Sequence, residues 1–434
     1  MPPYDRQILQ LAIPSIVSNI TVPLLGMVDV AIVGHLGDAA YIGAIAVGAM
    51  IFNVIYWIFG FLRMGTSGMA AQALGARQLT DVLQLLVRSL SVGVMVALAV
   101  ILFQFPIKQL ALAIVAPEPQ IRSLVSTYFN ICVWGAPAML AMYGLTGWYI
   151  GMQNTRFPMI ISISQNVVNI AASLLMVFVF KMGIRGVAWG TLVAQYAGIA
   201  ISLTLLWCYY RRWWKYMRWE GLYDKNKMLR FFKVNSDIFI RTLFLVAVNF
   251  YFLAAGSRQG AVILAVNTLL MQLFILFSYV MDGFAFAGEA LCGKYYGAEN
   301  YEAFYKVLKR LFVWGLIVVI AFTIMYLIGG QSFLSLFTDD GIVLKVASVY
   351  FPWAIVIPMA GVAAFIWDGV FIGITETRGM LYSSIIATIF FFFIFLVFRS
   401  TWYNHALWLA FILFLITRGI VQSVIFKTVR KFRR

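Results

Sequence analysis

Long apolar runs, broken at intervals by Pro, Gly and charged clusters, dominate the chain. A helix needs roughly 20 consecutive apolar residues to cross a bilayer, and the breaks divide the sequence into about twelve runs of that order. The predicted spans are residues 8–33, 43–74, 86–105, 121–146, 158–180, 186–210, 234–256, 262–292, 309–328, 342–372, 380–399 and 405–426. The ten-residue alternation typical of outer-membrane barrels is absent. The pattern therefore predicts an all-α integral membrane protein with about twelve transmembrane helices.

The composition excludes most other classes of protein. Hydrophobic residues make up 63% of the 434 residues and charged residues only 11%, whereas a soluble domain carries about 25% charged residues. A chain with so few charged residues cannot cover a surface that faces water, so we expect an integral membrane protein. The net charge of +16 does not indicate a nucleic-acid partner, because the placement of the basic residues along the chain argues otherwise. Cys132, Cys208 and Cys292 lie inside apolar runs without CxxC spacing, so we expect buried thiols, no metal site and no cofactor.

The placement of the basic residues predicts the orientation of the chain. If the N-terminus is cytoplasmic, most of the 32 Lys and Arg residues fall in cytoplasmic segments. Three lie within predicted spans: Arg63, Arg241 and Arg418. The external segments hold only Lys108, Arg122, Lys181, Arg185, Arg258, Lys345 and Arg399. This bias fits the positive-inside rule, so we expect a multi-pass protein of the cell inner (plasma) membrane with both termini cytoplasmic. Membrane lipids with anionic headgroups are expected partners of the basic segments.

Two stretches of the sequence recur at one separation. Residues 75–78 (GARQ) recur as 297–300 (GAEN), and residues 149–156 (YIGMQNTR) recur as 371–378 (FIGITETR). Both pairs are 222 residues apart, so the two halves align across this stretch with no net gap. An internal duplication in an apolar chain indicates a secondary transporter, whose substrate site lies between the repeats.

A charged, Trp-rich stretch separates six predicted spans from six. We therefore predict an N-terminal six-helix lobe at 1–210, a cytoplasmic amphipathic linker at 211–233, which lies along the interface between the halves, and a C-terminal six-helix lobe at 234–434. Six is even, so both halves enter the membrane from the same side. The repeat should thus be parallel and pseudo-symmetric, with a central cleft between the lobes.

Ionisable groups inside a span are costly and are usually retained for function. Asp29 lies in the first span after Pro14 and Pro23, and proline frees backbone carbonyls and bends a helix. A bendable helix with a lone carboxylate suits a group that gains and loses a cation. The alternative is a buried salt bridge, for instance with Arg63 on the neighbouring span.

Polar side chains follow one face of the fifth span: Ser162, Asn166, Asn169 and Ser173. Thr191 and Gln195 form a shorter stripe on the sixth span. Neutral oxygens near a single carboxylate can complete a sodium site or position water for a proton. The alternative interpretation is hydrogen bonding between membrane helices.

The second half carries several acids within predicted spans. Asp282 and Glu289 are seven residues apart on one face of the eighth span, and Asp368 lies in the tenth span. Asp368 is the second-half acid that we favour for cation coupling. Asp237 and Arg241 are four residues apart, so a local ion pair is the simplest interpretation of that pair. Aromatic and Met residues nearby would suit a lipophilic cation.

Three motifs carry a resemblance to a known family. They are Phe59–Thr66 (FGFLRMGT) followed by 71–76 (AQALGA), Asp282-Gly283 with Glu289-Ala290, and Trp367-Asp368-Gly369 followed by Phe371-Ile372-Gly373. Over essentially its whole length the chain resembles the multidrug and toxic compound extrusion (MATE) transporters, in particular their DNA-damage-inducible F (DinF) branch.

This resemblance implies export of small organic cations or amphipathic compounds in exchange for protons or sodium. It also implies a first-lobe cation site in which Asp29, Asn169 and Thr191 match the family pattern. Ser173 stands where the family has an Asp. The serine removes one negative charge, so we favour H+ over Na+; binding of Na+ at Asp29, Asn169 and Thr191 is the alternative. Asp368 matches a coupling acid in the second lobe of other branches.

The remaining polar groups within spans are assigned to the substrate cavity: Arg63, Asn166, Gln195, Asp282 and Glu289. We expect a monomer in which substrate and coupling ion compete for carboxylates. The rival hypothesis is a lipid-linked precursor flippase of the same two-lobe superfamily, whose pyrophosphate cargo would favour a basic cavity. The interior acids outnumber the interior arginines, which favours cations. No HExxH or GxSxG motif occurs, so we do not expect an enzyme.

Overall fold

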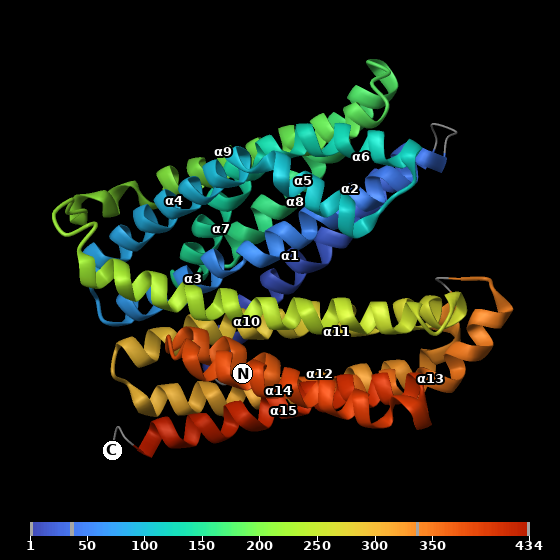
Figure 1. Cartoon of the computed structure of the whole chain (residues 1–434). Helices are drawn as coiled ribbons and strands as arrows, with labels where there is room; N and C mark the ends of the chain where they lie inside the picture. The colour runs from blue at the N-terminus through green and yellow to red at the C-terminus, as the bar shows by residue number, and fades with distance from the viewer. Residues whose placement is uncertain (1–2, 35–38, 336–337, 432–434) are drawn as a thin grey trace. The chain divides into compact units, whose positions relative to one another are not determined.

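The computed structural model describes residues 3–34, 39–335 and 338–431, and these residues form helices joined by short turns (Figure 1). The helices of the first half are α1 (Pro3–Gly34), α2 (Ala39–Phe59), α3 (Phe61–Gly75), α4 (Leu79–Leu102), α5 (Gln104–Val115), α6 (Pro119–Cys132), η1 (Val133–Gly135), α7 (Ala136–Gly151), α8 (Arg156–Leu174), η2 (Leu175–Val179), α9 (Ile184–Tyr210) and η3 (Arg211–Tyr216). Those of the second half are α10 (Lys225–Ser257), α11 (Ala261–Gly297), α12 (Tyr301–Ser335), α13 (Gly341–Gly373), α14 (Thr377–Trp402) and α15 (Asn404–Lys431).

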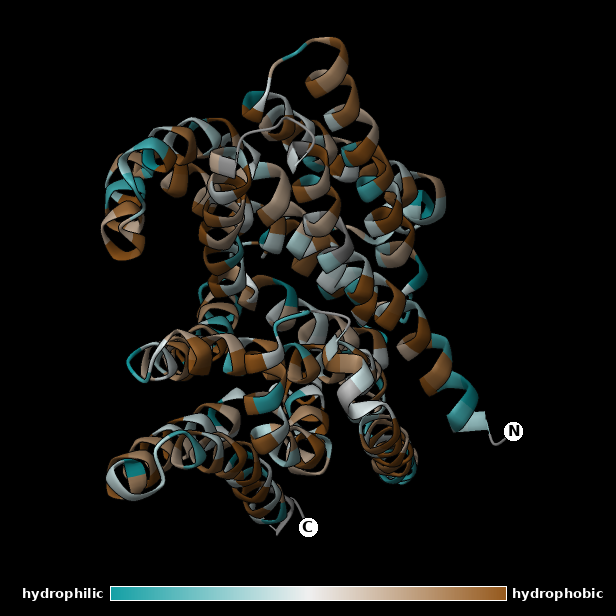
Figure 2. Cartoon of the chain, turned by 90° about the vertical axis from the view of Figure 1, so that its right-hand side faces the viewer, coloured by the Kyte–Doolittle hydropathy of each residue, from teal (hydrophilic) through white to brown (hydrophobic). Residues whose placement is uncertain are grey.

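Twelve helical segments of the described chain are long and apolar enough to cross a membrane. Hydrophobic residues, coloured brown, recur along all of these helices (Figure 2). The predicted all-α membrane fold is therefore confirmed. One helix was not predicted: α5 is a shorter apolar helix of 12 residues after the third span. The expected burial of the thiols is correct for Cys132 and Cys292 and wrong for Cys208, which is exposed on α9.

The chain folds into two compact units. One unit comprises residues 17–231, and the other comprises residues 1–16 together with 232–434. In the first unit α8 packs against α9 and α3 against α7; in the second, α11 packs against α13 and α14 against α15 (Figure 1). Helix α1 thus contributes its first residues to one unit and the remainder to the other. The predicted lobe boundaries stay a prediction.

The start of α1 is held within the second unit by polar contacts to α11 and α12. The indole of Trp314 donates to Oδ1 of Asp5 at 3.3 Å, and Nε of Arg310 lies 3.7 Å from the same oxygen. The Tyr295 hydroxyl donates to Oε1 of Gln7 at 2.9 Å. These bonds account for the grouping of residues 1–16 with the second half of the chain.

The internal repeat is visible in the backbone. Positive φ is seldom adopted by non-glycine residues, and six of the seven described residues that adopt it form three pairs: Arg77 and Glu299, Gln153 and Thr375, and Lys181 and Tyr403; the seventh is Ala116. Each pair is 222 residues apart, the separation found in the sequence. The turns that end corresponding helices therefore share one backbone geometry.

Close helix crossings repeat at the same separation. A Cβ atom added to Gly147 of α7 would lie 2.3 Å from the carbonyl oxygen of Arg63 on α3. A Cβ atom added to Gly369 of α13 would lie 2.3 Å from the carbonyl oxygen of Ala285 on α11. Small residues let membrane helices approach this closely. The two halves are thus pseudo-symmetric in packing as well as in sequence.

We expect Gly147→Ala and Gly369→Ala each to destabilise the protein, because a methyl group at either position collides with a backbone oxygen. Overpacking of this kind costs about 1–3 kcal/mol. Thermal unfolding of the purified protein in detergent measures the effect. Gly329→Ala is the matched control, since a Cβ atom there meets nothing within 4 Å, and its melting temperature should be unchanged or higher. Unaltered melting temperatures in both crossing variants would contradict the close approach.

Candidate functional site

Asp29 is a buried carboxylate on the part of α1 that follows Pro23. Its exposed fraction is 7%, and among the described residues its Oδ1 atom has no hydrogen-bond partner. None of the ion pairs found in the described part of the chain involves Asp29, so the salt bridge to Arg63 considered from the sequence is not formed there. A buried carboxylate is costly unless it is paired. Asp29 is therefore set up to receive a cation or a proton.

Asn169 of α8 and Thr191 of α9 form a hydrogen-bonded pair in the unit that contains Asp29. Nδ2 of Asn169 donates to the Thr191 hydroxyl at 3.2 Å, and that hydroxyl donates to the Val187 carbonyl at 3.0 Å. Tyr128 on α6 interacts with Thr191 and lies within electrostatic reach of Asp29. The structure thus brings Asp29 of α1 and the Asn169–Thr191 pair of the consecutive helices α8 and α9 to one region of residues 17–231.

Several buried oxygen atoms of this unit lack a hydrogen-bond partner among the described residues. They are Oδ1 of Asp29, Oδ1 of Asn169, Oγ of Ser173, Oε1 of Gln195, the Tyr56 hydroxyl, Oγ1 of Thr66 and Oγ of Ser202. Buried polar atoms are almost always paired with protein or ordered water. Oxygen atoms are also the ligands that hard cations prefer. A concentration of unpaired oxygens is therefore what a site for a small cation, or for water that carries a proton, would offer.

The local structure around Ser173 is unusual. Helix α8 ends one residue after Ser173, and residues Leu175–Val179 form a π-helix; π-helical turns are frequent at functional sites. A Cβ atom added to Gly190 of α9 would lie 2.2 Å from the Ser173 hydroxyl oxygen. Gly190 therefore lets the backbone of α9 touch Ser173, and the small serine side chain fits the contact.

The polar stripe of α8 divides into two parts with different surroundings. Nδ2 of Asn166 donates to the Thr21 carbonyl at 2.8 Å, and the Ser162 and Thr21 hydroxyls lie 2.8 Å apart. These contacts clamp the backbone of α1 two residues before Pro23. Asn169 and Ser173, further along α8, carry the unpaired oxygens instead. The structure thus places Asn166, which we assigned to the cavity, against the α1 backbone.

Asp368 in the other unit has a very different environment. It is 7% exposed and accepts hydrogen bonds from Nη2 of Arg241, from Nη2 of Arg418 at 2.5 Å and from Nε2 of Gln422 at 2.7 Å. Two guanidinium groups thus neutralise this carboxylate permanently. Its geometry, unlike that of Asp29, leaves no need for an exchangeable cation, although its predicted coupling role is untested.

The predicted local ion pair between Asp237 and Arg241 is wrong. Arg241 points to Asp368, and Asp237 accepts a hydrogen bond from the Thr377 hydroxyl at 2.8 Å. Asp282 lies within electrostatic reach of Arg241. Glu289 is buried on α11, and both Asp282 and Glu289 make contacts of their own. These two acids belong to residues 232–434 and so to a different unit from Asp29.

Sequence reasoning missed the partners of Asp368. One signal was available: Arg418 and Gln422 are four residues apart and so share a face of α15. A lone arginine in a span with an amide on the same face indicates a buried polar cluster. Nothing in the sequence, however, connects that face to position 368.

Comparison with known proteins gives a consistent result. The family model MatE matches residues 14–175 and 238–397. The DNA damage-inducible protein F of Escherichia coli (strain K12) is 34% identical over 431 residues, which is 98% of this chain and 92% of that protein. The probable multidrug resistance protein NorM of Thermotoga maritima is 22% identical, over 80% of this chain and 75% of its own length. The crystal structure of the Vibrio cholerae MATE transporter VcmN in the bent form matches with a TM-score of 0.87 at 16% identity, over 98% and 96% of the two chains.

We expect Asp368→Asn and Asp29→Asn to have opposite effects on stability. Asp368→Asn leaves two buried guanidinium groups without their carboxylate, which costs about 3–5 kcal/mol and should lower the melting temperature and the folded yield. Asp29→Asn removes a buried charge that has no partner, so the melting temperature should be unchanged or higher. Thermal unfolding in detergent compares the two. Equal decreases in melting temperature in the two variants would contradict the difference in pairing between the two carboxylates.

We also expect Asn166→Ala to loosen α1. Loss of the hydrogen bond to the Thr21 carbonyl lowers the free energy of local opening by about 1 kcal/mol. The equilibrium constant for local opening therefore increases severalfold. Amide hydrogen exchange of peptides from residues 17–34 measures this opening. Gln165→Ala is the control, because that amide makes a weak 3.9 Å contact with the Met139 sulfur and no hydrogen bond to α1 among the described residues. Exchange that is no faster in Asn166→Ala than in Gln165→Ala would count against the clamp.

Proposed function

The chain belongs to the MatE family, and from this membership we propose that it is a secondary transporter that exports organic cations or amphipathic compounds by antiport, with H+ rather than Na+ as the coupling ion. The resemblance noted in the sequence is thereby confirmed. The protein is a multi-pass membrane protein of twelve helices, and the family consists of transporters rather than enzymes. Substrate, coupling ion and site residues are our proposal.

The observation that carries the proposal is the buried, unpaired Oδ1 atom of Asp29. A carboxylate in a low-dielectric interior requires a positive partner, and no arginine or lysine pairs with it among the described residues. A proton and a cationic substrate can each supply that charge. Because both cannot be held by one carboxylate, arrival of one favours release of the other.

The mechanism that we propose uses the bend of α1. Pro23 lies between the clamp at Thr21 and the carboxylate of Asp29, and proline interrupts the hydrogen bonds of a helix. Protonation of Asp29 removes its charge, and the segment after Pro23 then changes its packing and releases substrate outward. Substrate entry from the cytoplasm releases the proton. Rocking of the two lobes alternates access to the site.

The preference for protons follows from the ligand set. By the resemblance, the span-five acid of the family is replaced by Ser173, so Asp29 is the one acidic side chain among Asp29, Asn169, Ser173 and Thr191. Sodium needs several oxygen ligands with compensating charge, whereas a proton needs one acceptor. The neutral oxygens of Asn169 and Ser173 can then hold water beside Asp29. Sodium bound at Asp29, Asn169 and Thr191 remains the alternative ion.

The second candidate function is a lipid-linked precursor flippase. A cargo with pyrophosphate calls for basic groups that are free to bind it. The buried arginines Arg241 and Arg418 both bond to Asp368, which offsets one of their two positive charges. The buried carboxylate of Asp29, whose Oδ1 atom has no partner among the described residues, is the observation that favours cationic cargo. We further propose that the protein is a monomer in the cell inner membrane with both termini cytoplasmic, in contact with membrane lipids.

Transport in proteoliposomes tests the proposal. With tetraphenylphosphonium as a lipophilic cation, wild-type flux should follow an imposed pH gradient without sodium and should not follow a sodium gradient at equal pH. Asp29→Asn should reduce gradient-driven flux to background, since the carboxylate that both ions share is gone. Asp339→Asn, which removes an exposed loop acid, should transport normally.

Three results would count against the proposal. Normal flux by folded Asp29→Asn would remove Asp29 from the mechanism. Flux driven by sodium alone would replace the proton as coupling ion. Absence of cation flux in the wild type, with movement of a pyrophosphate-linked lipid instead, would favour the flippase.

A further inference from the structure

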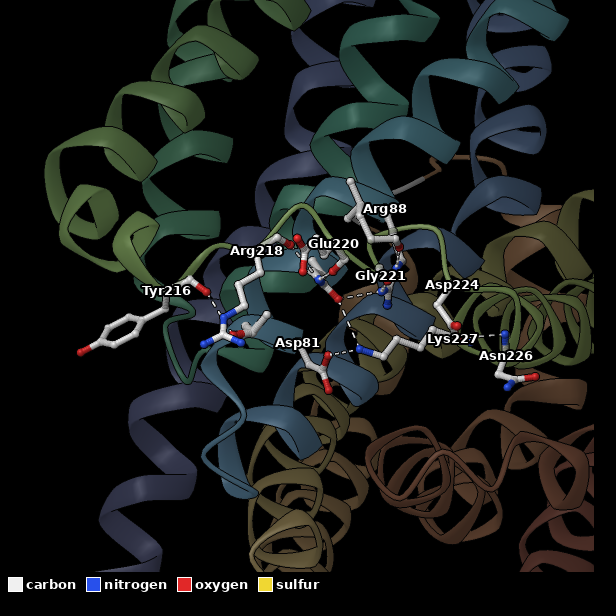
Figure 3. A network of polar contacts seen from close by, with 12 residues as sticks. Asp81, Arg88, Tyr216, Arg218, Glu220, Gly221, Asp224, Asn226 and Lys227 are labelled. Atoms are coloured by element: carbon white, nitrogen blue, oxygen red, sulfur yellow. Dashed lines mark hydrogen bonds and ion pairs between the residues drawn. The ribbon is translucent and has the colours of Figure 1, made fainter.

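The segment that follows η3 is fastened to α4 through its backbone. The Thr80 hydroxyl donates to the carbonyl of Tyr216 at 3.0 Å. Nε2 of Gln84 donates to the carbonyls of Arg218 and Glu220 at 2.8 and 3.0 Å (Figure 3). Side chains on one face of α4 thus hold several successive peptide groups of the segment. This arrangement is specific, because most loops rely on their own turns or on water.

A buried arginine completes the attachment. Arg88 is 3% exposed and donates to the carbonyl oxygens of Leu222 and Gly221 and to Oε1 of Gln84 (Figure 3). Nζ of Lys227, at the start of α10, lies 2.6 Å from Oδ1 of Asp81. The charge of Arg88 is therefore used to hold backbone carbonyls, and the segment is fixed at its middle and at its end.

The attachment leaves the basic side chains of the segment outside. We call residues 211–219 the basic–aromatic surface. Its basic members, all exposed, are Arg211, Arg212, Lys215 and Arg218. Its aromatic members are Trp213, Trp214, Tyr216 and Trp219. No acidic residue occurs between 211 and 219, and none of the ion pairs found among the described residues uses these four cations.

The position of this surface follows from the connectivity. Helix α9 and helix α10 both belong to membrane-spanning segments, and the basic–aromatic surface lies on the stretch that joins them. The surface must therefore lie at one face of the bilayer. Trp219 is 68% exposed and Tyr216 is 42% exposed, and Trp and Tyr side chains are favoured at the level of the headgroups.

We propose that the basic–aromatic surface is a binding site for the headgroups of anionic phospholipids. Clusters of four or more Lys and Arg directly beside a membrane span attract anionic headgroups, at about 1 kcal/mol for each cation. The four cations supply this charge, and the aromatic rings anchor the segment at the same depth. The site lies wholly within residues 17–231, the unit that also contains Asp29. The proposal does not depend on the transported substrate or on the coupling ion.

The attachment to α4 explains why this stretch is a site and not only a charged loop. A flexible segment loses conformational entropy when it binds. Here Thr80, Gln84 and Arg88 have already fixed the backbone. Arg211, Arg212 and Lys215 lie on the 3-10 helix η3, which ends where this attachment begins, so an ordered stretch of chain carries the cations before a headgroup arrives.

The test measures the lipid preference of the full-length protein. Wild type is reconstituted in phosphatidylcholine with and without phosphatidylglycerol, and the selectivity for spin-labelled phosphatidylglycerol over spin-labelled phosphatidylcholine is determined by electron paramagnetic resonance. The test variant combines Arg211→Gln, Arg212→Gln, Lys215→Gln and Arg218→Gln. Each lost cation should weaken headgroup binding at the site about fivefold, so the selective component should disappear.

The matched control removes the same charge elsewhere. It combines Arg77→Gln, Arg156→Gln, Lys309→Gln and Arg378→Gln, which replace exposed basic residues at separate helix ends. This control should keep the wild-type selectivity. A third variant with Arg211→Lys, Arg212→Lys and Arg218→Lys keeps the charge and should also keep it. Because the Lys variant alters the same positions, it supports the proposal even if the Gln variant folds poorly.

Three outcomes overturn the proposal. Wild-type selectivity in the Gln variant, confirmed as folded by its thermal unfolding, would show that the surface does not bind the lipid. Equal losses in the Gln variant and the scattered control would show that total charge, rather than this site, sets the preference. Wild type without selectivity for phosphatidylglycerol, but with binding of an acidic peptide or a nucleic acid at the surface, would assign it to another partner.

Discussion

A carboxylate inside a bundle of membrane helices has to be neutralised, and much of this structure follows from how that is done. Asp368 is neutralised by the protein itself, because Arg241 and Arg418 both bond to it. Asp29 is equally buried, but its Oδ1 atom has no partner in the described part of the chain. Breaking a buried pair costs several kcal/mol, so the first arrangement is fixed. The second arrangement is open to exchange, because any small cation that enters relieves the same cost.

The duplication accounts for the geometry of the chain but not for its chemistry. The left-handed residues and the close glycine crossings recur at 222 residues, so both halves use the same turns and the same helix contacts. The carboxylates at positions 29 and 368 do not recur. At that separation Asp368 corresponds to Thr146, and Arg63 corresponds to Ala285. Backbone geometry is constrained by sterics in both halves alike, whereas buried charges are placed singly. Equal packing in the halves is therefore compatible with an exchange site in one half and a permanent ion cluster in the other.

The features that the sequence predicted are local to one stretch of chain, whereas the features that it missed are tertiary contacts between helices. The apolar runs and the repeat separation are properties of one stretch of chain, and both are confirmed by the helices and turns observed. The stripe on α8 was also visible, because helical periodicity puts its members on one face. The partners of that face were not visible. Asn166 contacts α1 and Asn169 contacts Thr191, and only tertiary packing decides between these neighbours. The partners of Asp368 were missed for the same reason, since Arg241 is 127 positions away and Arg418 is 50 positions away.

Helix α1 connects the exchange site to both units of the protein. Its first turns are held by Trp314 and Arg310 through Asp5, and its middle is clamped by Asn166 through the Thr21 carbonyl. Pro23 follows the clamp directly and removes a hydrogen bond that would stiffen the helix. The polar contacts described for Asp5, Gln7 and Thr21 all lie before Pro23. A change of charge at Asp29 consequently acts first on the segment after Pro23. The covalent helix then links that segment to residues 1–16, which group with residues 232–434.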